Sequence, residues 1–160
     1  MWDYIYPFFE WSENSGLGHW VRASKWTFAI TEVLHLLGLT ALLGAMLLIA
    51  MRLFNMALQK KAVAELAREM MPWTLAALAT VVVTGVLLFA SEAVKCWRNP
   101  AFRYKMLFLL LALVFQFTVL KRISQAEEER FSPFARKIAG LTAIVLWFGV
   151  GFAGRAIAFF

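Results

Sequence analysis

Four long apolar segments constrain this chain more than any other feature. They cover roughly Thr27–Met51, Pro72–Val94, Pro100–Leu120 and Ile138–Phe160. As α-helices of about 20 residues or more, such segments are long enough to cross about 30 Å of hydrocarbon. Hydrophobic residues make up 62% of the 160 positions, whereas about half is usual in a soluble domain. The sequence therefore predicts an all-α integral membrane four-helix bundle.

Residues 1–26 form an aromatic N-terminal segment, and residues 27–160 form the four-transmembrane-helix domain. The segment lacks early Lys or Arg residues and is interrupted by Pro7 and Gly16, so we do not expect a cleavable signal peptide. Aromatic rings favour the headgroup zone of a bilayer, so the segment is predicted to be a retained interfacial anchor. Its rings are those of Trp2, Tyr4, Tyr6, Phe8, Phe9, Trp11 and Trp20.

The connections between the spans differ in character. "NP" at Asn99–Pro100 and "SP" at Ser132–Pro133 place a capping side chain before a proline, which predicts helix starts. The first connection, "RLFNMALQKKAVAELAREMM", has apolar residues at helical spacing and is predicted to be an interfacial helix or a continuation of the first span. The third, "KRISQAEEERFSPFARK", is charged and should be solvated.

Basic residues predict the orientation in the membrane. The net charge of +6 comes from Lys and Arg residues concentrated in the connections, which suits anionic lipid headgroups and does not indicate nucleic-acid binding. The first and third connections hold nine basic residues, and the N-terminal segment with the second connection and its flanks holds six. The positive-inside rule then predicts a multi-pass protein of the bacterial inner membrane with both termini in the periplasm.

Polar side chains converge at one end of the predicted bundle. Glu32 and His35 lie one turn apart, so they share a helix face. Four crossings bring the start of the first span to the same end as the other polar span ends. Those ends carry Ser91, Glu92, Arg103, Tyr104, Lys105 and Arg155.

Two interpretations fit this convergence. In the first, Glu32, His35, Glu92 and Arg155 form a buried polar network that fixes helix register, with Arg155 buried against Glu32 or Glu92, because charges within a membrane commonly pair with one another.

In the second interpretation, His35 is an axial ligand of haem b, and Glu32 orients its ring. Gly38 would admit the flat macrocycle one turn away. Arg155, Arg103 or Lys105 would bind the propionates. The chain has two histidines, so the second axial ligand would be His19, a group from a second subunit or a non-histidine ligand.

Catalytic signatures are missing from the sequence. Cys96 is the single cysteine, which excludes an intrachain disulfide and a cysteine metal cluster and favours a buried or interfacial thiol. There is no Ser–His–Asp arrangement, phosphate-binding glycine loop, HExxH motif or dinucleotide fingerprint. We therefore do not expect an independent hydrolase or kinase.

Four motifs carry a resemblance to a known family. At "HLLGLTALLGAMLLIAMRL", "PWTLAALATVVVTGVLLFASEA", "NPAFRYKMLFLLLAL" and "GRAIAFF" the chain resembles small bacterial four-helix membrane proteins known only as a family of unknown function. The histidine followed by Leu-Leu-Gly is also similar to CopD-like and HemJ-like membrane proteins, which have b-type cytochrome character. That similarity implies a ligand role for His35.

Three functions remain open from the sequence. The first is a haem-binding electron-transfer protein, acting as a homo-oligomer or as a subunit of a larger membrane complex. The second is a non-catalytic accessory or structural subunit. The third is a small proton or cation transporter that uses Glu32, His35 and Glu92 as a relay.

Overall fold

Four long helices form the body of the protein in the computed structural model, which describes residues 3–126 and 130–159. They are α3 (Lys25–Leu53), α4 (Val63–Ser91), α6 (Pro100–Phe115) and α8 (Pro133–Ala156). The third span continues from α6 through a π-helical turn, η2 (Gln116–Leu120), into α7 (Lys121–Gln125). All four are long and apolar enough to cross a membrane, so the predicted all-α four-helix architecture is confirmed.

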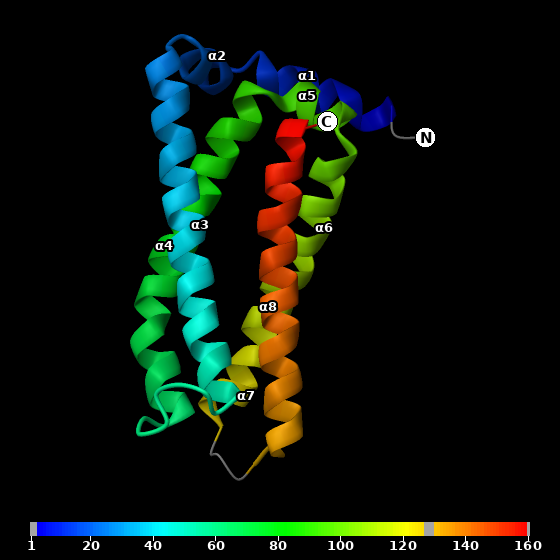
Figure 1. The fold of residues 1–160 in the computed structure, drawn as a ribbon. Coiled ribbons are helices and arrows are strands. Elements are labelled where there is room, and N and C mark those ends of the chain that lie inside the picture. The colour runs from blue at the N-terminus through cyan, green and yellow to red at the C-terminus, as the bar shows by residue number, and fades with distance from the viewer. Residues whose placement is uncertain (1–2, 127–129, 160) are drawn as a thin grey trace.

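The helices pack as two pairs, which meet between α3 and α8 and between α4 and α7. Helix α3 packs along α4, α6 packs along α8, and α3 and α8 connect the two pairs (Figure 1). The ends of the chain lie at the same end of the bundle (Figure 1). The four helices therefore bring the polar ends of the spans together at that end, as predicted.

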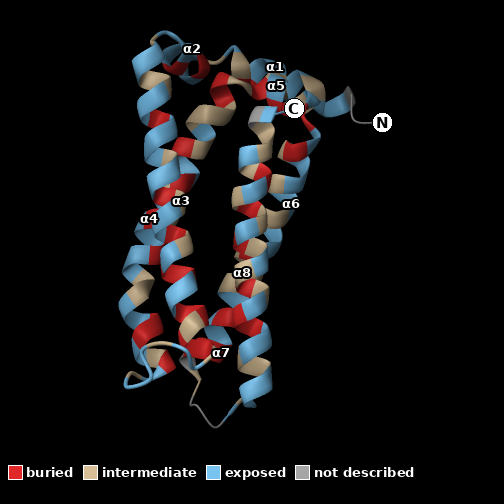
Figure 2. Ribbon diagram, in the orientation of Figure 1, coloured by how far each residue is buried: buried red, intermediate tan, exposed pale blue. Residues whose placement is uncertain are grey.

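The apolar core extends from the middle of the bundle to the end farther from the chain termini. Buried residues gather there around α7 (Figure 2), and the largest of them are Trp147, Leu42, Met46 and Leu120. Toward the chain termini, several buried positions of the spans hold small or hydroxyl-bearing residues. They include Thr31, Gly38, Thr84, Ser91, Ala101 and Ala153.

Both predicted capping motifs are confirmed. The Asn99 side chain accepts a hydrogen bond from the Ala101 amide at 2.9 Å, and Ser132 accepts one from the Ala135 amide at 3.2 Å. Each cap satisfies an amide at the start of a helix whose first residue is proline. The third and fourth spans consequently begin at Pro100 and Pro133.

The predicted start of the second span is wrong, as is the prediction for the first connection. Helix α4 begins at Val63, nine residues earlier than expected, and Pro72 lies inside it. The first connection is neither an interfacial helix nor a continuation of α3. Asn55, with a φ angle of 63°, adopts the left-handed backbone that ends α3, and Leu58 in the following loop has a φ angle of 54°. The apolar residues at helical spacing belong to the first turns of α4 instead.

The aromatic N-terminal segment packs on the end of the bundle. Its helices, α1 (Tyr6–Glu13) and α2 (Gly16–Arg22), lie with α5 (Ala93–Arg98) across the end that carries the termini (Figure 1). The Glu13 carboxylate accepts a hydrogen bond from the Val94 amide at 2.6 Å. Arg22 donates to the Ser91 carbonyl at 2.8 Å. These contacts join the segment to the turn between α4 and α5; Trp2 lies outside the described residues.

Gly18 provides a test of this docking. A Cβ atom at Gly18 would lie 2.5 Å from the Ala90 carbonyl oxygen and 2.6 Å from that of Glu13. We expect Gly18→Ala to lower the free energy of unfolding by roughly 1–3 kcal/mol, because backbone atoms must move to relieve the overlap. Thermal unfolding in detergent measures this. The matched control is Gly16→Ala, since nothing lies within 4 Å of a Cβ there; equal melting temperatures for the two variants would show that α2 is not packed this closely.

Cys96 lies buried in α5, as expected for its thiol. Burial, with a smaller contribution from the Glu92 carboxylate, raises the pKa of the thiol to about 11. Because the thiolate is the reactive form, reaction of the folded protein with a disulfide reagent such as 4,4′-dithiodipyridine should be slow at pH 7.5 and accelerate as the pH approaches 11. Unfolded protein, with an ordinary thiol pKa of about 8.5, should react rapidly at pH 7.5. Equally rapid labelling of folded protein at that pH would contradict the burial of this thiol.

Candidate functional site

His35 is the centre of the candidate site. It lies on α3, ten residues after the start of the helix, and is half-buried against α4. Its Nδ1 atom lies 2.9 Å from the Thr84 hydroxyl oxygen. The imidazole also covers Gly85, where an added Cβ would lie 3.2 Å from the ring Cε1 atom. The absence of a side chain at Gly85 therefore gives the ring its room.

The hydrogen bonds around Thr84 determine which ring nitrogen of His35 carries the proton. The Thr84 hydroxyl donates to the Thr80 carbonyl at 2.5 Å, and two oxygens this close need a proton between them. The Thr84 oxygen then acts as an acceptor toward His35, so Nδ1 carries the hydrogen. In a neutral imidazole with its proton on Nδ1, the lone pair lies on Nε2, the form that binds a metal; the ring also forms a hydrogen bond with the Val81 backbone.

Lys105 is a cation in the bundle interior whose charge acts on this histidine. It lies on α6, is half-buried, and interacts electrostatically with His35. Its Cε and Nζ atoms each lie 3.6 Å from where a Cβ would stand on Gly154 of α8. Within residues 3–126 and 130–159, no hydrogen bond or ion pair is found for the Lys105 ammonium. The group is thus a cation available to an anionic ligand.

We call this group of residues the polar layer. It consists of His35, Thr84 and Lys105 and of the two glycines that make room for them, Gly85 and Gly154. On the side of the chain ends, the layer is followed by the stacked rings of Phe89 and Phe102, whose centroids are 5.7 Å apart. On the opposite side, it is followed by the apolar core. The layer combines an unprotonated ring nitrogen with a positive charge between two apolar regions.

The predicted network of Glu32, His35, Glu92 and Arg155 does not assemble. Glu32 is exposed on α3, and Glu92 binds Lys95 at 3.3 Å. The prediction that Arg155 is buried is wrong: it is exposed, and its guanidinium lies 5.2 Å from the centroid of the Phe159 ring. The physical reason is that Arg155 stands in the last turn of α8, from which a long side chain reaches the membrane surface.

Most of the other predicted cofactor residues lie outside the polar layer. His19 is exposed on α2. Arg103 is exposed, lies 5.6 Å from the centroid of the Trp97 ring and donates to the Trp97 carbonyl at 3.4 Å. Gly38 is buried against α4, where a Cβ would lie 3.0 Å from a methyl group of Val81. Gly38 thus allows close helix packing, in place of the predicted access for a macrocycle.

The partner of His35 differs from the one that the sequence predicted. Thr84 and Gly85 were visible as a polar and a small residue interrupting an apolar span, a pattern that also fits ordinary helix packing. The same holds for Gly154 in the fourth span. Helical spacing groups residues within one helix, as it grouped Glu32 with His35, but it does not give the register between two helices.

A bare metal ion and a haem make different demands on this site. Structural and catalytic ions such as zinc usually take three or four protein ligands, whereas haem iron needs one or two. In the part of the chain that the structure describes, no three or more His, Cys, Asp or Glu side chains are grouped to hold a metal ion. The polar layer offers a metal one ligand, the imidazole of His35, which is closer to the demand of haem iron than to that of a bare ion.

Comparison with known proteins identifies the family of the chain. No match to a curated protein or to a solved structure was found. A family model described as "Family of unknown function (DUF6644)" matches residues 8–160. This match confirms the predicted resemblance to a small family of unknown function. The similarity to CopD-like and HemJ-like proteins stays a prediction. The chain thus belongs to the DUF6644 family, whose function is unknown.

Proposed function

We propose that this membrane protein binds haem b through His35 and takes part in electron transfer, as a homo-oligomer or as a subunit of a larger complex. The observation that carries the proposal is the hydrogen bond between His35 and Thr84. It holds the ring in one orientation and keeps the proton on Nδ1, which directs the lone pair of Nε2 toward a ligand. Metal-binding histidines characteristically donate their other ring N–H to such an acceptor.

Lys105 supports the choice of haem as the ligand. Haem carries two propionate carboxylates, and an ammonium group is a suitable partner for them. Because Lys105 interacts with His35, one molecule would satisfy both the ring nitrogen and the cation. Haem b, when bound, supplies a one-electron couple.

Of the residues present, His35 would supply one ligand to haem iron, and a second ligand would come from elsewhere. His35 stands about 15 Å along α3 from the start of that helix, whereas His19 is exposed on α2 at the end of the bundle. A second copy of the chain or a partner subunit therefore suits the sixth position better than His19 does. This is the basis for proposing an oligomer or a larger complex.

Replacement of His35 and Thr84 tests the proposal. Protein purified from haem-replete cells should show a Soret band, and His35→Ala should lose it. Thr84→Val keeps the shape of the side chain but removes the acceptor, so we expect haem affinity to fall roughly 10- to 100-fold, as for other partners of metal ligands. Absorption spectra and haem titration of the purified variants measure both effects. Thr84→Ser, which retains the hydroxyl, is the matched control and should behave like the parent.

The competing account is that the His35–Thr84 hydrogen bond only holds α3 against α4. Such bonds in membrane proteins contribute on average about 0.6 kcal/mol. Colourless, folded protein that takes up no haem, together with a loss of stability in Thr84→Val, would favour this account. It would also favour the accessory-subunit function. The relay function has less support, because Glu32 is exposed and Glu92 binds Lys95.

We further propose that the protein lies in the bacterial inner membrane with both termini in the periplasm, on the basis of the basic-residue distribution. Two exposed positions test this orientation: Gly16 on α2 and Gln59 in the loop between α3 and α4. In cells with a permeabilised outer membrane, a membrane-impermeant maleimide should label Gly16→Cys and should label Gln59→Cys only after lysis. Buried Cys96 keeps the background low. The reverse pattern would place the termini in the cytoplasm.

A further inference from the structure

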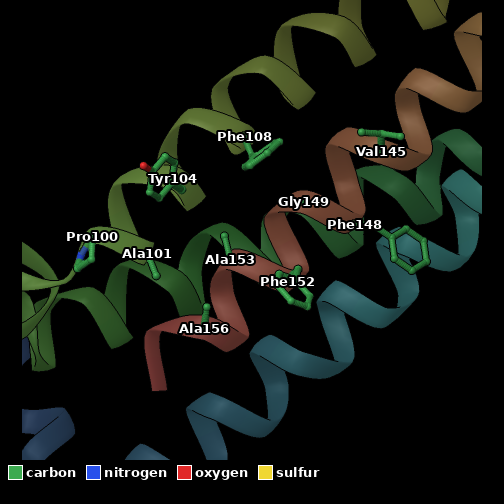
Figure 3. Close-up of a pocket in the computed structure, with 10 residues that line it drawn as sticks. All are labelled: Pro100, Ala101, Tyr104, Phe108, Val145, Phe148, Gly149, Phe152, Ala153 and Ala156. Carbon is green, nitrogen blue, oxygen red and sulfur yellow. The ribbon is translucent and has the colours of Figure 1, made fainter. Parts of the chain in front are cut away.

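An apolar groove runs between α6 and α8 on the outside of the bundle (Figure 3). Its volume is about 670 Å³, within the range of roughly 300–1,000 Å³ typical of small-molecule sites. Ala101 and Ala153, both buried, lie at its floor. Tyr104 and Phe152 line it while exposing 62% and 81% of their surface, so they form its rims. The groove therefore opens to the surroundings of the bundle, which in a membrane are lipid chains.

The depth of the groove in the membrane matches one leaflet. Its α8 lining runs from Val145 to Ala156, a rise of about 16 Å. Half of a bilayer with about 30 Å of hydrocarbon is about 15 Å. The groove begins at Pro100 and Ala156, at the end of the bundle that carries the chain termini, and extends toward the middle of the spans. A single lipid acyl chain entering from that surface would follow it along its length.

Arg155 supplies a charge at the entrance of the groove. It stands three residues after Phe152 and seven after Phe148, so it continues the same stripe of α8 by one turn. The side chain is exposed. No carboxylate among the described residues forms an ion pair with it. A cation at the headgroup level above an apolar groove complements a lipid with an anionic headgroup.

We propose that this groove is a binding site for an anionic phospholipid. One acyl chain lies between α6 and α8, and the headgroup phosphate pairs with the Arg155 guanidinium. The groove is on the outer surface of the α6–α8 pair, whereas His35 faces α4. The lipid site therefore does not depend on the haem proposal, and each can fail without the other.

Native mass spectrometry of delipidated protein, titrated with phosphatidylglycerol or phosphatidylcholine of identical chains, tests the site. We expect the parent to prefer phosphatidylglycerol. Arg155→Gln should weaken phosphatidylglycerol binding about fivefold, the contribution typical of one basic side chain near an anionic headgroup. Its binding of phosphatidylcholine should weaken less, because the choline cation of that lipid offsets the phosphate charge that Arg155 attracts. The matched control is Arg98→Gln, which removes an exposed cation at the same end of the bundle but outside the groove, and it should behave like the parent.

Changes in the groove itself separate chain binding from surface charge. Ala153→Phe fills the floor and should abolish binding of both lipids. If that variant does not fold, Phe152→Ala serves in its place, because this side chain is mostly exposed. Removing one rim of the groove should weaken the binding of both lipids. Equal affinity of the parent for the two lipids would overturn the proposal, as would equal losses in Arg155→Gln and Arg98→Gln. Groove variants that dissociate an oligomer while binding lipid normally would also overturn it, by showing that the groove contacts a second copy.

Discussion

The close approach of α3 and α4 is the contact on which the candidate site depends. Gly38 lies against Val81 and Thr80, and the two helices leave no space there for an additional methyl group. Because the two helices run antiparallel, three residues back along α3 correspond to three residues forward along α4. That register places His35 opposite Thr84 and Gly85. A larger residue at position 38 would separate the helices and stretch the hydrogen bond that orients the imidazole.

The apolar core and the polar layer lie at different levels of the bundle, and buried Arg52, Thr74 and Ser124 lie at the level of the core. Without a hydrophobic driving force between helices in lipid, association depends on close packing, and the core around Trp147, Leu42 and Met46 provides it. The polar layer lies nearer the chain termini, at the end that is covered by α1, α2 and α5 (Figure 2). Glu13 and Arg22 join that cover to the end of α4. A site for a ligand can therefore be built at one level while the core maintains the fold.

Local chemistry in the sequence predicted the helix starts at Pro100 and Pro133, because a cap and a proline act on their own neighbours. The apolar segment from Pro72 gave no sign of the true start of α4 at Val63, because the first turns of that helix are charged and the proline stands inside it. For the site, the sequence identified His35 and Lys105 but paired His35 with Glu32. Pairing across helices depends on their register and rotation, which no local pattern encodes. The structure shows that His35 is paired with the Thr84 hydroxyl and not with the Glu32 carboxylate.

The electrostatics of the polar layer limit the kind of ligand that it suits. A half-buried ammonium in a membrane span is costly unless it has a partner or reaches water. The carboxylates nearest in sequence to the layer, Glu32 and Glu92, are directed elsewhere: one is exposed and the other binds Lys95. The layer therefore combines the Lys105 ammonium with an imidazole that Thr84 holds through Nδ1. A cation as ligand would add repulsion from Lys105, whereas a metal centre that carries its own carboxylates would reduce the cost of burying that ammonium.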